Sequence, residues 1–128
     1  MKLDPITQYI LESMVPMTGM AKHLPPELYK SLITWLLPDS GFYGKGNSKP
    51  QDIENENIGF QETVKEYSSK CRRIAKKEKL FGIWNNGAGD ISAYSFRNGD
   101  IWTAMHEEGR LVNNFPYKEW LKFTKKYG

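Results

Sequence analysis

Hydrophobic residues change their spacing at Leu80, and this change divides the chain into a mainly helical part and a strand-forming part. Before Leu80 the clearest apolar residues are three or four positions apart, so that at about 100° per residue they share one stripe of a helix. These residues are Phe60, Val64, Tyr67, Cys71 and Ile74. The pattern predicts an amphipathic helix over residues 60–77.

Beyond Leu80 the spacing falls to two, which is typical of strands. Runs rich in β-branched and aromatic residues occur at 80–84, 91–96 and 100–106, and a shorter run follows at 110–112. Asn98 and Gly99 separate two of the runs, and an Asn-Gly pair predicts a hairpin with a type I′ turn because both residues tolerate positive φ. We therefore expect an antiparallel β-meander of four or more strands.

Prolines that suit a first helical turn, together with apolar residues at helical spacing, predict three more helices, over residues 5–14, 26–37 and 116–127. In the last of these, Trp120, Phe123 and Tyr127 share one face. Residues 39–59 are polar and rich in Gly and Asn without a sustained period, and we interpret them as a long loop.

These elements predict an α+β fold. A meander with one apolar face has to bury that face, and the matching apolar surfaces belong to the predicted helices. We expect one face of the sheet to be covered by the helices at 5–14, 26–37, 60–77 and 116–127.

The composition is typical of an ordinary globular protein, with many aromatic residues. Of its 128 residues, 39% are hydrophobic, 26% are charged and 13% are aromatic. Its single cysteine excludes an internal disulfide framework, and no apolar run suits a secretory signal or a membrane span. We therefore expect a cytoplasmic protein that does not associate with membranes.

The charge is uneven along the chain. Residues 1–59 carry five lysines and seven acidic residues, whereas residues 60–128 carry thirteen cations and eight acidic residues. The basic stretch in the predicted helix is compatible with binding to nucleic-acid phosphates, and we interpret it first as a solvated helix face because glutamates balance part of it. The residues that would bind phosphates are Lys70, Arg72, Arg73, Lys76 and Lys77.

The residues that could carry catalysis or hold a metal do not form a recognisable motif. Cys71 lies in an apolar stripe, where a buried inert thiol is the better interpretation, and the histidines His23 and His106 lack zinc-site spacing. Glu107 and Glu108 beside His106 could supply a general acid and base, but a solvated turn explains them more simply. We expect no catalytic residue, no metal site and no cofactor.

Several short segments, taken in their order along the chain, resemble the SUKH superfamily, which includes fungal cell-wall regulators and bacterial immunity proteins that neutralise polymorphic toxins. They are Leu24, Pro25, Leu28 and Tyr29; Asn86, Gly87, Ala88, Gly89 and Asp90 before Ile91; Asn98, Gly99, Asp100 and Ile101; and Asn114, Phe115, Glu119, Trp120 and Leu121. The resemblance covers most of residues 24–121 and implies a single SUKH-like domain over residues 1–128.

The resemblance implies an immunity-type protein that is not an enzyme and that occludes the active site of a cognate toxin domain. Its net charge of +3 suits a toxin that is not a nuclease, or contact away from a phosphate-binding cleft. The expected partner contacts lie on one edge or face of the sheet, because aromatic residues and Arg dominate interface energetics. They are Tyr94, Trp102, His106, Glu107, Glu108 and Arg110. A small nucleic-acid-binding module is the alternative, and an enzyme built on His106 is the third hypothesis.

Overall fold

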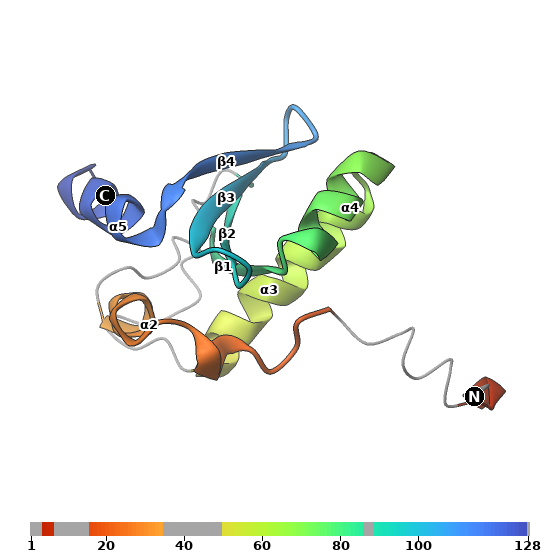
Figure 1. Cartoon of the computed structure of the whole chain (residues 1–128), viewed down its shortest axis with the longest axis horizontal. Helices are drawn as coiled ribbons and strands as arrows, with labels where there is room; N and C mark the ends of the chain where they lie inside the picture. The colour runs from red at the N-terminus through yellow and green to blue at the C-terminus, as the bar shows by residue number, and fades with distance from the viewer. Residues whose placement is uncertain (1–3, 7–15, 35–49, 86–88, 128) are drawn as a thin grey trace.

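The computed structural model describes residues 4–6, 16–34, 50–85 and 89–127 (Figure 1). Within these residues, one antiparallel sheet of order β1-β2-β3-β4 packs against helices, so the predicted α+β fold is confirmed. The helical elements are η1 (Ala21–His23), α2 (Pro26–Thr34), α3 (Pro50–Lys65), α4 (Ser69–Lys77) and α5 (Tyr117–Tyr127). The strands are β1 (Leu80–Asn85), β2 (Ile91–Ser95), β3 (Asp100–Met105) and β4 (Arg110–Pro116).

Helices cover both faces of this sheet, so the expectation of one covered face was wrong. Every residue of β2 is buried, which requires packing on both sides because successive side chains point to opposite faces. One face packs on α3 and α4, and the other packs on η1, α2 and α5 (Figure 1). The first face includes Leu80, Ala93 and Ala104; the second includes Phe81, Tyr94 and Ile101.

The predicted helix over residues 60–77 is two helices, and the first of them begins earlier than expected. Residues 50–59, interpreted as part of a loop, form the first half of α3. The chain breaks after Lys65, and Ser68 begins α4 by accepting a hydrogen bond from the backbone N–H of Cys71 at 3.3 Å. The rest of the predicted loop, residues 39–49, lies outside the described residues, as do residues 7–14 and 35–37 of the other predicted helices.

The early part of α3, residues 50–59, was not predicted because its buried position Asn57 is polar and interrupts the apolar stripe. Asn57 is 1% exposed and Gln61 is 8% exposed, and both face β1. The Asn57 Oδ1 atom accepts the N–H of Gly82 at 2.9 Å, and the Gln61 Nε2 atom donates to the carbonyl of Leu80 at 2.9 Å. Side chains from a helix thus satisfy backbone groups of the edge strand β1, where a neighbouring strand would otherwise do so.

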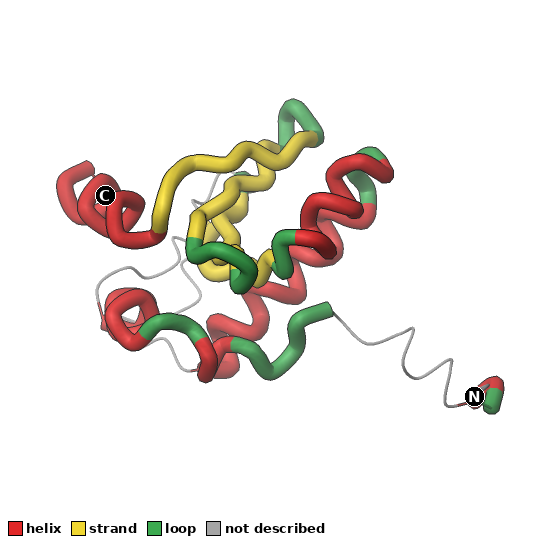
Figure 2. Tube along the Cα trace, in the orientation of Figure 1, coloured by secondary structure: helices red, strands yellow, loops and turns green. Residues whose placement is uncertain are grey.

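The two described hairpin loops share one geometry, and it is not the expected type I′ turn. Each loop holds four residues, 96–99 and 106–109, and ends in a glycine with positive φ (Figure 2). Gly99 N–H donates to the carbonyl of Ser95 at 2.8 Å, and Gly109 N–H donates to that of Met105 at 2.8 Å. Asn98 has no positive φ, so only the glycine of the predicted Asn-Gly pair adopts the left-handed conformation.

Candidate functional site

The turn between β3 and β4 presents four of the six predicted partner contacts. His106, Glu107 and Glu108 form the turn, Arg110 begins β4, and all four side chains are exposed. The Arg110 Nε atom forms an ion pair with the Glu108 carboxylate. We call these four residues the hairpin tip.

A neighbouring loop holds the hairpin tip in place. The Oδ1 atom of Asp90 accepts the backbone N–H of His106 at 3.1 Å and lies 2.9 Å from its ring Nδ1 atom. Gly89 makes room for that ring, because a Cβ atom built there would lie 2.9 Å from the same Nδ1 atom. The backbone and the imidazole of His106 are thus fixed by the segment that leads into β2.

The other two predicted contacts, Tyr94 and Trp102, lie in the core on opposite faces of the sheet. Tyr94 is 9% exposed and meets the rings of Phe96 and Tyr117 edge-on, with centroids 5.0 Å and 6.0 Å away. Trp102 packs against the cluster formed with α3 and α4. The expectation that Tyr94 contacts a partner is corrected by its burial, and Trp102 retains only partial exposure.

Packing also explains much of the surplus of aromatic residues. Trp84 lies edge-on to Trp120 with centroids 6.0 Å apart, and Phe81 lies edge-on to Phe96 at 6.2 Å. Phe123 is the exception among them, since its side chain is 53% exposed and tilts against the ring of Phe115 at 6.2 Å. On the predicted face of α5, Trp120 is therefore in the core and Phe123 is not.

The phenol of Tyr67 is partly buried and interacts with Asp90 and Cys71. Burial raises the pKa of Tyr67 above its ordinary value of 10.0, and electrostatic interaction with Asp90 and, to a smaller extent, with Cys71 raises it further. Its hydroxyl is buried and has no hydrogen-bond partner among the described residues, as is also true of the Trp102 Nε1 atom. Cys71 is buried and its Sγ atom donates to the carbonyl of Gly109 at 3.8 Å, so it is shielded from solvent reagents.

The five cations of the nucleic-acid alternative are all exposed on α4, but they divide into two groups. Arg72 and Lys76 lie one turn apart on the side that faces α3. Lys70, Arg73 and Lys77 lie on the rest of the solvent face at helical spacing. The Arg72 Nη1 atom donates to the carbonyls of Lys65 at 3.2 Å and Tyr67 at 2.6 Å, so this guanidinium also caps the end of α3.

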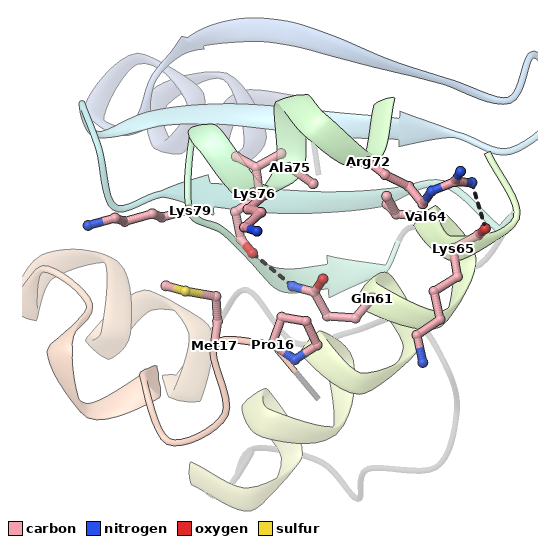
Figure 3. Close-up of a pocket in the computed structure, with 10 residues that line it drawn as sticks. Pro16, Met17, Gln61, Val64, Lys65, Arg72, Ala75, Lys76 and Lys79 are labelled. Atoms are coloured by element: carbon pink, nitrogen blue, oxygen red, sulfur yellow. Dashed lines mark hydrogen bonds between the residues drawn. The ribbon is translucent and has the colours of Figure 1, made fainter. Parts of the chain in front are cut away.

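A cavity of about 390 Å³ lies between α3, α4 and the segment at Pro16 and Met17 (Figure 3). It is a second candidate site, and no sequence motif indicated it. Its walls come from three separate parts of the chain, and only their packing brings them together. The lining residues are Pro16, Met17, Gln61, Val64, Lys65, Arg72, Ala75, Lys76, Lys79 and Leu80.

Neither a metal site nor a membrane span is found in the described part of the chain. No group of three His, Cys, Asp or Glu side chains is arranged there to hold a metal ion. No helix there has both the length and the apolar character needed to cross a membrane.

Comparison of the chain with protein-family models, with curated proteins and with solved structures finds no match. The SUKH resemblance therefore stays a prediction.

Proposed function

We propose that the protein is an immunity-type protein that binds a cognate toxin domain and occludes its active site, using the hairpin tip and the adjoining edge of β4. The observation that supports this most is the hairpin tip itself, where four charged or titratable side chains project from one fixed turn.

A fixed turn suits tight binding because its conformational entropy has already been lost on folding. Ordering a mobile interface side chain costs about 0.5–1.5 kcal/mol, and preorganisation avoids that cost for the backbone and for His106. Glu107 and Glu108 are exposed at the tip, and Arg110 pairs with Glu108 beside them. Mixed charges of this kind favour one partner orientation over others.

The edge strand β4 extends the same surface toward α5 (Figure 1). β4 is the last strand of the sheet, and Asn113 and Asn114 on it are exposed. At its far end, the exposed ring of Phe123 lies against Phe115. An aromatic side chain that can be buried by a partner is the kind of residue that contributes most binding energy. Phe123 thus replaces Tyr94 as the aromatic contact in the proposal.

The test is protection of growth against the toxin domain that a neighbouring reading frame is expected to encode. The chain should restore growth when both are expressed. Glu107→Lys with Glu108→Lys should abolish protection and weaken binding of the purified toxin domain by at least about tenfold, because charge reversal puts like charges against the partner. Phe123→Ala should weaken binding as well.

The matched control reverses two charges on α4, by Lys70→Glu with Lys77→Glu. These residues are equally exposed and belong to the nucleic-acid alternative, so the control should keep protection. Loss of protection in the α4 variant alone would refute the proposed interface. Loss of salt-dependent binding to random oligonucleotides in that variant would instead support the nucleic-acid module.

A further inference from the structure

The cavity between α3 and α4 combines an apolar floor with a cationic rim. Val64, Ala75 and Leu80 are buried and line the cavity. Pro16 and Met17 line the side opposite Val64 and Ala75 (Figure 3). At about 390 Å³ it falls within the range of cavities that hold small organic ligands, which begins at roughly 300 Å³.

Among the described residues, the rim carries four cations and no acidic residue. Lys79 lies at one end, Lys76 at the middle, and Arg72 with Lys65 at the other end (Figure 3). None of the three lysines has an ion-pair partner within the described residues. Glu78, which precedes Lys79, is buried and pairs with Arg97 at 2.5 Å, and Glu66, which follows Lys65, is exposed to solvent. The charges of Lys76 and Lys79 at the cavity mouth are therefore not neutralised by an ion pair.

Backbone strain is concentrated at the same place. Among the described residues, the non-glycine positions with positive φ are Met17 at 65° and Lys79 at 52°, and both line this cavity. Side chains disfavour this conformation, so glycine would suit either position better. Strained positions that retain a side chain occur preferentially at functional sites. The strain is thus a second and independent indication that these two side chains are used.

The lining also limits the kind of ligand. Among the described residues no aromatic ring lines the cavity, so a nucleobase would have nothing to stack on there. Both N–H groups of the Gln61 amide are already used, on the Asn57 Oδ1 atom at 3.1 Å and on the Leu80 carbonyl at 2.9 Å. A ligand therefore meets aliphatic surface inside and positive charge at the mouth.

We infer that this cavity binds an aliphatic carboxylate, with the hydrocarbon chain against Pro16, Met17 and Ala75 and the carboxylate at Lys76 and Lys79. The site lies on α3 and α4 and does not include the hairpin tip, so the inference does not rest on the proposed function.

Isothermal titration of the full chain with decanoate tests the inference, with decan-1-ol and inorganic phosphate as reference probes. Decanoate should bind saturably at one site, decan-1-ol should bind at least about fivefold more weakly, and phosphate should show no saturable binding. Equal binding of decanoate and decan-1-ol would refute the cationic rim as a recognition element, and absence of decanoate binding would refute the site.

Variants locate the binding. Lys76→Gln with Lys79→Gln should weaken decanoate binding by about tenfold, because each cation near the surface raises the affinity a few-fold. The matched control is Lys70→Gln with Lys77→Gln, which changes the net charge equally on the other side of α4 and should leave the affinity unchanged. An equal loss in both variants would mean that only net charge matters, and would refute the site.

Lys79→Gly separates binding from stability. The variant should unfold at the same or a higher urea concentration, because glycine relieves the positive φ, yet it should weaken decanoate binding. Unchanged decanoate binding in Lys79→Gly would contradict the role given to this side chain. Binding to vesicles of an anionic phospholipid without binding of free decanoate would indicate a membrane surface and would overturn the inference.

Discussion

The contact between α3 and β1 predicts opposite effects for the same substitution at two glycines. A Cβ atom at Gly82 would lie 2.3 Å from the Phe60 Cβ atom, 2.9 Å from its Cγ atom and 3.0 Å from the carbonyl of Glu56. Truncating the Phe60 ring would not relieve the first contact, because the Cβ atom remains in every residue except glycine. Helix and strand would have to move apart.

Two opposing terms determine the effect of Gly82→Ala. Replacing glycine restricts the unfolded chain and stabilises the protein by about 0.4–1 kcal/mol where the native conformation accepts alanine. Overpacking of a close contact costs about 1–3 kcal/mol or more. Because the clash involves backbone and a Cβ atom that cannot rotate away, the cost exceeds the gain. We expect Gly82→Ala to lower the free energy of unfolding by about 1–2 kcal/mol or more.

Gly59 provides the matched control, since it is exposed in the middle of α3 and a Cβ atom there would meet nothing within 4 Å. Gly59→Ala should raise the free energy of unfolding by about 0.5–1 kcal/mol through helix propensity. Urea unfolding followed by circular dichroism and tryptophan fluorescence measures both variants. A Gly82→Ala variant as stable as the parent, with an unchanged denaturant slope, would refute the close packing of α3 on β1.

Three further predictions concern Asn57, Ser68 and Tyr67. Asn57→Ala should cost about 2–3 kcal/mol, because it leaves the buried N–H of Gly82 unpaired, and hydrogen exchange of that amide should accelerate; unchanged exchange would contradict the contact. Ser68→Ala should cost about 1 kcal/mol by removing the cap of α4, measured as a lower urea midpoint, whereas Ser69→Ala should not. Tyr67 has a folded-state pKa above its ordinary 10.0, so unfolded chains lose its proton first and stability should fall as the pH rises through and above 10.0. In Tyr67→Phe the loss of stability at alkaline pH, measured by urea unfolding, should be smaller. A pH profile identical to that of the parent would show that this phenol does not contribute to the pH dependence.

The strands and their order could be predicted because each apolar run is bounded by glycine-containing turns. The spacing of two between apolar residues could not show whether helices cover one face of the sheet or both. In β2, Ile91 and Ala93 point to one face, and Tyr94 points to the other. Local sequence suits either a half-covered or a fully covered strand here, and the positions of α2 and α5 decide it. The mistaken role of Tyr94 follows from the same uncertainty.

The first half of α3 and the cavity were missed for different physical reasons. Asn57 is buried against a partner on β1, Gly82, that is more than fifteen residues away, so its burial leaves no local apolar pattern. The cavity is formed by residues 16–17, 61–65 and 72–80, and its shape exists only after folding. The exposed hairpin tip was accessible to prediction because a glycine-ended polar turn between strands is exposed almost regardless of the rest of the fold.

The sealed edge of β1 limits how copies of this protein could join through their sheets. Open sheet edges are templates for pairing with another chain, and a molecule with two of them can polymerise without end. Here Asn57 and Gln61 occupy the N–H of Gly82 and the carbonyl of Leu80 at the start of β1, which hinders strand addition there, whereas β4 is the opposite edge of the sheet. Pairing of β4 with β4 would close after two copies, which leaves no free end for a growing fibre.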